Sequence, residues 1–202
     1  MTIDVRKSQR GFSMIEVLVA FAVLSVGMLG IAGLLMSGQR SGQASFDRTQ
    51  AVALASDMLE RILANPGGAA AYETGMGSNA LGRGNAVSQP AACVATECTA
   101  AETVARDRWE WDRKLDGAST TDGVNAIGGL IQASGCIVFE PNPDMANSGR
   151  MSVIVSWLGL SETSDALVVG AAECGDIDDD DARFRRQVVL DTIVVDPEDL
   201  VP

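Results

Sequence analysis

The chain has 202 residues, of which 47% are apolar but only 4% aromatic, and it contains 21 glycines. These values suit one domain with an aliphatic core and an additional segment. The net charge of −12 argues against nucleic acid as a partner, because phosphate binding needs a basic surface. No histidine is present, which excludes imidazole bases, imidazole metal ligands and His-activated nucleophiles. Walker, G-x-S-x-G and G-x-G-x-x-G motifs are also missing from the sequence, so we expect neither an enzyme nor a cofactor.

A long apolar run follows a basic N-terminus that contains Arg6, Lys7 and Arg10. The 20 residues from Val17 to Met36 carry no charge, and a helix of that length is roughly 30 Å long, the thickness of a bilayer core. We therefore predict one membrane-spanning helix, with the N-terminus in the cytoplasm and the remaining chain outside. A signal peptide is disfavoured because its apolar region is shorter and ends in a small-residue cleavage site. A buried core helix is disfavoured because such helices rarely have so long an uncharged run.

Glu16 is an acid at the edge of this run. At the centre of a membrane span a carboxylate costs about 2.5 to 3.5 kcal/mol on insertion scales, and less at the edge. One interpretation is a capping box in which Ser13 caps the helix and Glu16 binds the Ser13 amide. The other is pairing with a cation. No basic residue lies between Phe12 and Met36, but cleavage after Gly11 would create a free amine on Phe12, four residues before Glu16.

The segment "GFSMIEVLVAFAVLS" resembles the prepilin motif of type IV pilins and pseudopilins: a short basic leader ending in glycine, cleavage before phenylalanine, and glutamate fifth in the mature chain. The resemblance implies that a prepilin peptidase cuts between Gly11 and Phe12 and methylates the new Phe12 amine. It also implies that Glu16 pairs with a Phe12 amine as subunits pack into a filament. One departure concerns the middle of the helix: many major pilins have a proline there, and this chain has glycines (Gly27, Gly30, Gly33).

Beyond Met36 the sequence stays helical but becomes amphipathic. Residues at spacings of three and four predict one apolar stripe that a folded domain covers (Val52, Ala55, Leu59, Ile62, with Met58 and Leu63 beside it). Charged residues fall largely outside this stripe (Asp47, Arg48, Asp57, Glu60, Arg61). The sequence Asn65-Pro66-Gly67-Gly68 predicts the end of the helix, because proline cannot continue it.

The next segment, Ala69 to Ala92, is rich in small residues and lacks periodicity, so we expect an irregular surface connection. A capping box at Thr99 and Glu102 then predicts a second helix that runs toward Gly117. Four of its residues are predicted to lie on one face of the helix (Val104, Arg108, Trp111, Leu115). We interpret Trp109 and Trp111 as core anchors rather than ligand-stacking residues.

Strand patterns occupy the C-terminal third of the chain (Cys136–Phe139, Met151–Leu158, Leu167–Val169, Gln187–Val195). In the second of these, apolar residues alternate with others from Met151 to Trp157, which is typical of a half-buried strand. No helical segment separates the strands, so an antiparallel sheet is favoured over a parallel one.

Four cysteines lie beyond the predicted span, in a compartment expected to be oxidising, and two disulfides are their simplest use. Of the three pairings that exist, we favour Cys93 with Cys98, which are close in sequence, and Cys136 with Cys174, which flank the sheet. A zinc cluster is disfavoured because the spacing does not match a usual zinc ribbon.

An acidic run extends from Asp176 to Asp181. Counted from Asp176, an EF-hand loop would need glycine at Asp181 and glutamate at Gln187, so that motif is excluded. A solvated loop is favoured, and an irregular cation site at Asp176, Asp178 and Asp180 is the alternative.

The fold class that the resemblance implies is α+β, a pilin fold whose long N-terminal helix packs on a small antiparallel sheet. The expected division is a leader (1–11), a membrane and filament-core helix (12–36) and a periplasmic domain (37–202). The "GCIVF" and "MSVIVSWLG" strands, with the "RRQVVLDTIVV" tail, make the chain similar to the PilV group of minor pilins, the type IV pilus modification proteins.

That resemblance implies a structural subunit that primes pilus assembly. Its expected partners are the prepilin peptidase, the major and other minor pilins, and the inner-membrane assembly machinery. Its expected location is the inner membrane as a single-pass precursor, then the pilus. Two alternatives stay open: a type II secretion pseudopilin and a membrane-anchored adhesin or binding module.

Overall fold

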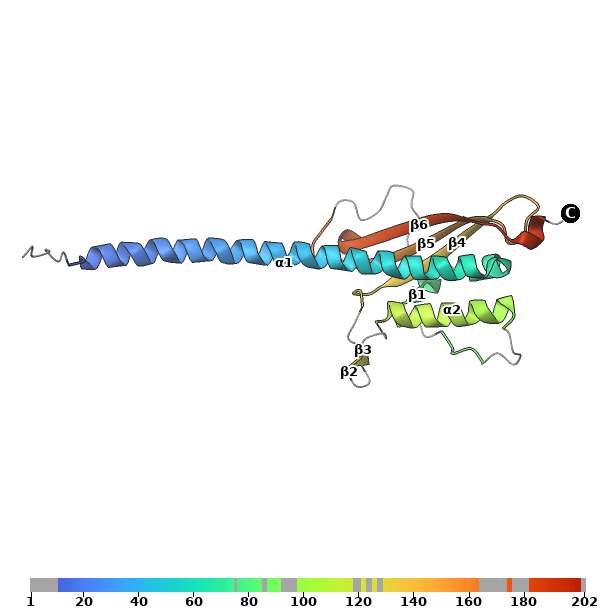
Figure 1. Cartoon of the computed structure of the whole chain (residues 1–202). Coiled ribbons are helices and arrows are strands. Elements are labelled where there is room, and N and C mark those ends of the chain that lie inside the picture. Colours follow the sequence, from blue (N-terminus) through green and yellow to red (C-terminus); the bar gives the residue numbers. More distant parts are fainter. Residues whose placement is uncertain are drawn as a thin grey trace, which may run out of the picture. The chain divides into compact units, whose positions relative to one another are not determined.

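The computed structural model describes residues 11–74, 76–84, 87–91, 98–117, 121–122, 125–126, 129–163, 174–175 and 182–200. The chain divides into two compact units, Met1–Gln43 and Ala44–Pro202. Helix α1 (Met14–Ala64) contributes residues to both units. The second unit contains the other described helices and strands (Figure 1).

In the second unit, α1 presents one buried stripe to the rest of the domain. Its buried members follow helical spacing (Asp47, Ala51, Ala55, Met58, Ile62). The prediction was correct for Ala55, Met58 and Ile62, whereas Val52 and Leu63 are 37% and 46% exposed. Two members of the buried face were not predicted: Asp47, which was expected outside the stripe, and Ala51, a small residue that allows close packing.

The long helix ends at Ala64, as Asn65 and Pro66 predicted. The segment that follows is not the surface connection we expected. It forms two 3₁₀ helices, η1 (Pro66–Tyr72) and η2 (Gly77–Asn79), and a short strand β1 (Leu81–Gly82). Several of its side chains belong to the core (Ala69, Tyr72, Ala80, Leu81). Thr74 pairs with strand residue Ile137, whose N–H donates to Thr74 Oγ1 at 2.8 Å and whose carbonyl accepts from the Thr74 N–H at 3.0 Å.

Helix α2 (Ala100–Leu115) begins with the predicted capping box, in which Thr99 accepts from the Glu102 N–H and Glu102 accepts from the Thr99 N–H. Its buried face contains two carboxylates that the prediction left out (Val104, Asp107, Trp111, Asp112, Leu115), whereas Arg108 is only half-buried. Of the two predicted core anchors, Trp111 is buried and its Nε1–H donates to the Leu54 carbonyl at 2.9 Å, whereas Trp109 is only partly buried and its ring lies beneath Arg113.

Helices α1 and α2 are antiparallel, because contacts near the end of one helix join residues near the start of the other. Leu54 contacts Trp111, whereas Asn65 donates to the carbonyl of Ala100 at 3.0 Å.

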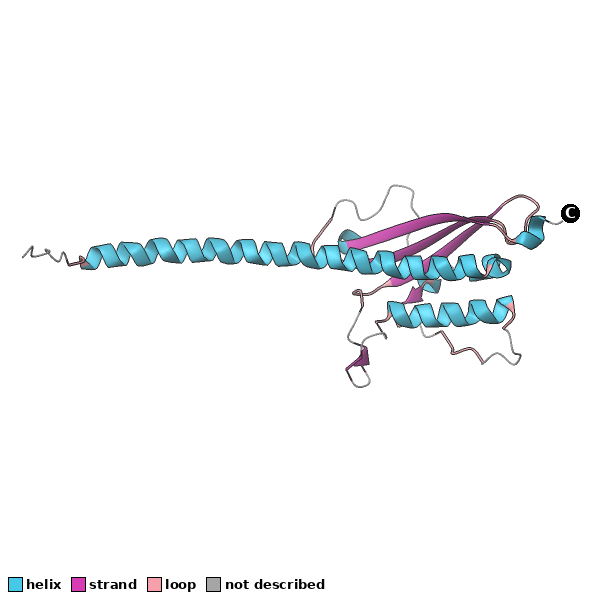
Figure 2. Cartoon of the chain, in the orientation of Figure 1, coloured by secondary structure: helices cyan, strands magenta, loops and turns pink. Residues whose placement is uncertain are grey.

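The main sheet has the strand order β1-β4-β5-β6, and all its pairs are antiparallel, which confirms the predicted orientation. Strands β4 (Ser134–Pro141) and β5 (Gly149–Leu158) contain the first two predicted strands, and β6 (Arg185–Val194) contains all of the last one except Val195 (Figure 2). The predicted strand Leu167–Val169 lies outside the described residues. A separate hairpin pairs β2 (Thr121–Asp122) with β3 (Asn125–Ala126). Two further 3₁₀ helices, η3 (Ala182–Phe184) and η4 (Pro197–Leu200), flank β6.

Strand β5 is more buried than the prediction of a half-buried strand implied, because both of its faces are covered over part of its length. Met151, Val153 and Val155 face the main core, as the alternation predicted. On the other face, Ile154 packs with Ala80 and the disulfide, and Ser156 Oγ donates to the Cys174 carbonyl at 2.7 Å. Cys174 therefore covers one end of the second face of the sheet. Together these elements form a pilin-like α+β fold, in which a long N-terminal apolar helix packs on a four-stranded antiparallel sheet.

Candidate functional site: the N-terminal junction and its helix

The predicted cleavage junction lies just outside the first turn of α1. Gly11, Phe12 and Ser13 precede the helix, and the Phe12 side chain is 83% exposed. The Ser13 carbonyl accepts from the Glu16 N–H at 3.0 Å and from the Val17 N–H at 3.3 Å, so Ser13 starts the helical hydrogen bonding. The Gly11–Phe12 peptide bond is therefore not held by helical structure.

Glu16 occupies the first turn of α1 and is exposed. A negative charge there interacts favourably with the positive end of the helix dipole. The bonds described between Glu16 and Ser13 are between main-chain atoms. The side-chain capping box, the cleavage at Gly11–Phe12 and the pairing of Glu16 with a Phe12 amine all stay predictions.

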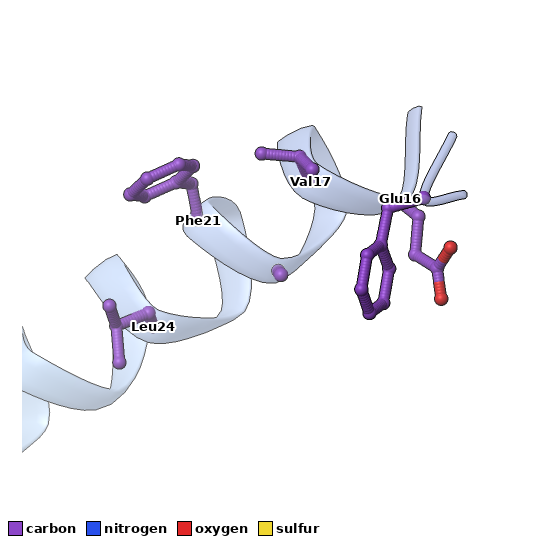
Figure 3. A pocket seen from close by; sticks show the side chains of 6 residues that line it. Glu16, Val17, Phe21 and Leu24 are labelled. Atoms are coloured by element: carbon purple, nitrogen blue, oxygen red, sulfur yellow. The ribbon is translucent and has the colours of Figure 1, made fainter. Parts of the chain in front are cut away.

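Beside Glu16, the helix surface has an open groove of about 530 Å³. Apolar side chains from successive turns line most of it (Phe12, Val17, Ala20, Phe21, Leu24). Figure 3 shows Glu16 near the start of the helix and Val17, Phe21 and Leu24 further along it. The arrangement puts one carboxylate at the end of an apolar surface.

The apolar character surrounds the helix rather than forming one face. Large apolar side chains from Met14 to Met36 are exposed around it, and an 18-residue window has a mean hydropathy of 2.5 with no side chain buried inside the chain. Ser25, a polar residue within the run, donates its hydroxyl to the Phe21 carbonyl at 2.7 Å. By length and composition, the helix can cross a membrane. A helix that is apolar all round needs lipid or other helices around it.

The predicted disulfides can be compared with the structure in part. Cys136 and Cys174 are bonded, and both are buried. Cys98 is also in a disulfide, but its predicted partner Cys93 lies outside the described residues.

Two further predicted features also fall outside the described part of the chain: the leader residues Met1–Arg10 and the acidic run with Asp176, Asp178 and Asp180. Among the residues that are described, no three Asp, Glu or Cys side chains lie close enough to hold a metal ion.

Sequence reasoning missed a polar network that joins α1, η1 and α2. Arg61 Nη1 donates to Asp107 Oδ1 at 2.7 Å and to Glu110 Oε2 at 2.8 Å. The buried Tyr72 hydroxyl donates to Asp107 Oδ2 at 2.5 Å and accepts from Asn65 Nδ2 at 3.3 Å. The three-residue spacing of Asp107 and Glu110, on the face of α2 that lies toward α1, indicated part of this network. The sequence around Tyr72 gave no such indication, because that segment lacks periodicity.

The environment of this network favours the charged arginine and the neutral tyrosine. Burial alone would lower the pKa of Arg61, but its hydrogen bonds to Glu110 and Asp107 outweigh burial and raise that pKa. Burial and the bond to Asp107 raise the pKa of Tyr72. On the adjoining turn, burial raises the pKa of Asp112, although its carboxylate accepts from the Gly82 N–H at 2.7 Å. These groups fix the helices in the domain and serve no evident chemistry.

Comparison with known families gives two matches. Residues 6–32 match the prokaryotic N-terminal methylation motif, and residues 38–109 match type IV pilin Tt1218. No curated protein and no solved structure matches the chain. The first match covers the junction and the apolar helix, and the motif implies processing by a prepilin peptidase. The second match covers α1 from residue 38 onward, the segment with η1, η2 and β1, and the first part of α2, and pilins are structural, non-enzymatic proteins. The chain is therefore a type IV pilin-like protein with an N-terminal methylation motif and a Tt1218-like pilin region.

Proposed function

We propose that the protein is a minor pilin of the PilV group, a low-abundance subunit that primes assembly of a type IV pilus and enters it. The observation that carries this proposal is the helix that is apolar all round, with one acid in its first turn and an open Gly11–Phe12 junction before it. An ordinary membrane tether needs neither the acid nor the junction. The similarity of the strand and tail sequences to that group supports the minor-pilin role.

In this proposal the apolar helix has two environments in succession. In the inner membrane, lipid surrounds the exposed apolar side chains of residues 14–36. In a filament, the same side chains pack against helices of other subunits. Both surroundings are apolar, so the hydrophobic contribution changes little between them. Packing and polar contacts then decide whether transfer from membrane to filament is favourable.

Glu16 is the polar group that can distinguish the two environments. Removal of residues 1–11 leaves an amine on Phe12, four residues before Glu16. In a filament core an unpaired carboxylate is costly, whereas a carboxylate paired with a neighbouring subunit's amine is not. A pair of this kind forms only when neighbouring helices have the correct axial offset. Glu16 therefore sets the register between subunits.

The proposal also assigns partners and location. The prepilin peptidase cuts after Gly11 and methylates Phe12, and the inner-membrane assembly machinery adds the mature subunit to major and other minor pilins. The Cys136–Cys174 disulfide agrees with a head, the second unit Ala44–Pro202, that folds in an oxidising compartment on the periplasmic side.

The test of processing is mass spectrometry of the N-terminus of protein purified from its native membrane. The expected result is a chain that starts at a methylated Phe12. A working population that retains Met1 to Gly11 would contradict the proposal and would favour a membrane-anchored binding module.

A second test separates the pilus from a secretion system. Deletion of the gene is expected to reduce twitching motility and surface piliation and to leave exoprotein secretion unchanged. Loss of secretion with normal motility would instead identify a type II secretion pseudopilin.

The register role is tested with Glu16→Leu in the full chain. We expect normal membrane insertion, because leucine is favourable in lipid, but impaired entry into the filament. The conservative variant Glu16→Asp keeps the charge and should retain more assembly than Glu16→Leu. Normal piliation and normal incorporation of Glu16→Leu would remove the register role while leaving the cleavage result unaffected.

A further inference from the structure

Arg40 is the first charged residue of α1 after Glu16, and the 23 residues between them, Val17 to Gln39, are uncharged. The chain is helical throughout this stretch, and Arg40 is exposed. Arg40 makes no hydrogen bond and no ion pair with a residue that the structure describes. A guanidinium keeps its charge at any ordinary pH and can only donate. The Arg40 side chain is therefore free to bind an acceptor outside the described chain.

The spacing of Glu16 and Arg40 matches the thickness of a bilayer. They are 24 residues apart, which is roughly 36 Å along a helix. The hydrocarbon core of a bilayer is about 30 Å thick, and the headgroups bring the total to about 40 to 45 Å. In the orientation proposed above, Glu16 lies at the cytoplasmic boundary of the core. Arg40 then lies about 6 Å beyond the opposite boundary, within the headgroup layer of the periplasmic leaflet.

No acid of α1 lies near enough in sequence to neutralise Arg40. Six uncharged residues, Ser41 to Phe46, separate it from Asp47, and Asp47 belongs to the buried stripe of the second unit. The side chains beside Arg40 are small or polar, and they are exposed (Ser37, Gly38, Gln39, Ser41). They leave the guanidinium open to a lipid headgroup.

From this placement we infer that Arg40 binds a lipid phosphate of the periplasmic leaflet and thereby sets the depth of α1 in the membrane. A guanidinium and a phosphate form charge-assisted hydrogen bonds, frequently two in parallel. The aliphatic part of the arginine side chain can lie along lipid while its charged end reaches the phosphate. The inference rests on the proposed membrane orientation of the helix, but it does not require assembly into a pilus.

Arg40 is a positioning residue that opposes movement of α1 toward the cytoplasm. Such movement would draw the Arg40 guanidinium into the hydrocarbon core, where a charge is costly. Two features favour that movement: Glu16, which is better solvated in water, and the three basic residues of the leader, which are attracted to phosphates of the cytoplasmic leaflet. Arg40 opposes both and so keeps the Gly11–Phe12 junction at the membrane surface.

The first measurement tests the contact with phosphate. The full-length precursor, with ¹³C in its arginine guanidinium carbons, is placed in bilayers of phosphatidylethanolamine and phosphatidylglycerol. The buffer contains no phosphate, so every ³¹P nucleus belongs to a lipid. Solid-state NMR then measures how much of the guanidinium signal is dephased by ³¹P. Arg40→Gln should remove one arginine's share of that dephasing, whereas Arg48→Gln, about two turns further along α1, should remove none.

The second measurement tests the depth of the helix. Met14→Cys and Ser37→Cys, in separate proteins, each carry one nitroxide at one end of the apolar run, and the described native cysteines are not free. Depth follows from the collision rates of the nitroxide with oxygen, which is enriched in hydrocarbon, and with a water-soluble nickel chelate. Adding Arg40→Gln should move the label at position 37 deeper and the label at position 14 toward water, each by roughly 3 Å, two residues of helical rise.

Opposite shifts of the two labels identify a translation of α1, because a change of tilt would move both labels in the same direction. Arg40→Lys keeps the charge and should retain most of the parent depth, and Arg48→Gln should change neither label. Dephasing that is equal in the parent and in Arg40→Gln would overturn the phosphate contact. Labels that do not move in Arg40→Gln, or that move in the same direction, would overturn the depth role. Neither result bears on the pilus, because both measurements use the purified protein alone.

Discussion

Asp107 is a single carboxylate that serves two elements of the head, so its removal should be strongly destabilising. One of its oxygens accepts from Arg61 of α1, and the other accepts from Tyr72 of η1. Asp107 is 8% exposed, and Tyr72 is fully buried. Asp107→Ala therefore leaves a buried hydroxyl without an acceptor and a half-buried guanidinium without one of its partners.

The size of the effect follows from what each group retains. An unsatisfied buried hydroxyl costs about 1 to 3 kcal/mol. Arg61 keeps Glu110 at 2.8 Å and Asp57 at 3.3 Å, so the lost ion pair costs less than the roughly 3 to 5 kcal/mol of an uncompensated buried pair. We expect a total of about 3 kcal/mol, or a fall in Tm of roughly 6 to 12 °C for a domain of this size.

Tyr72→Phe removes the donor together with its need for an acceptor, so it should cost only about 1 kcal/mol. In the double variant, Asp107→Ala no longer leaves that hydroxyl unsatisfied. The combined loss should therefore be smaller than the sum of the two single losses, by about 1 kcal/mol or more.

The assay is thermal unfolding of the full chain in detergent, followed by the near-ultraviolet circular dichroism of its tryptophans, of which Trp111 and Trp157 are buried. Glu162→Gln is the control, because its ion pair with Arg183 is exposed at 3.4 Å and should contribute less than about 1 kcal/mol. Either of two results would refute the reasoning: an Asp107→Ala variant as stable as the control, or strict additivity with Tyr72→Phe.

Three further predictions concern the head. Gly135→Ala should lower the free energy of unfolding by about 1 to 3 kcal/mol, because a Cβ there would lie 2.4 Å from the Trp111 ring. The control in the same melting assay is Gly67→Ala, because a Cβ at that position would meet nothing nearer than 3.7 Å. Replacing both Cys136 and Cys174 by serine should cost up to about 4 kcal/mol for a loop of this length, since the cysteines are 38 residues apart; a melting temperature equal to that of the parent would exclude this contribution. Hydrogen bonds from the Asn147 N–H and the Ser148 hydroxyl lower the pKa of Asp199, so its stabilising effect is present above the unfolded pKa of about 4 and is lost as the pH falls through the lower folded value. Asp199→Asn should therefore weaken the acid dependence of Tm below about pH 4, and melts that fall as steeply with acid as those of the parent would contradict this role.

Local signals were sufficient for the elements that the sequence predicted correctly. The capping box at Thr99, the Asn65-Pro66 helix end and the alternation in β5 each depend on residues a few positions apart. Cys136 and Cys174 were paired correctly, although Cys136 lies within β4 rather than beside the sheet, where it pairs with Ile154.

The errors occur where burial depends on residues far apart in the sequence. Tyr72 is buried because Asp107, 35 residues away, gives its hydroxyl a partner. Similarly, Ile154 is buried because Ala80 and Cys174, both far from it in sequence, pack on its face of the sheet. No periodicity within either segment contains that information.

The N-terminal helix differs from the head because its interpretation requires no long-range contact. Apart from the local bond from Ser25 to the Phe21 carbonyl, its exposed side chains from Met14 to Met36 are not buried by any described part of the chain, so composition and spacing alone describe its surface. Glu16 is the single carboxylate in that surface, and its position relative to Phe12 is fixed by the sequence and by the helical rise of about 1.5 Å per residue. The described part of the chain does not bury this apolar surface. A helix that is apolar on all sides, with one acid near its start, is stable only when lipid or neighbouring helices surround it. The sequence of residues 14–36 by itself therefore indicates that this helix needs lipid or other helices around it.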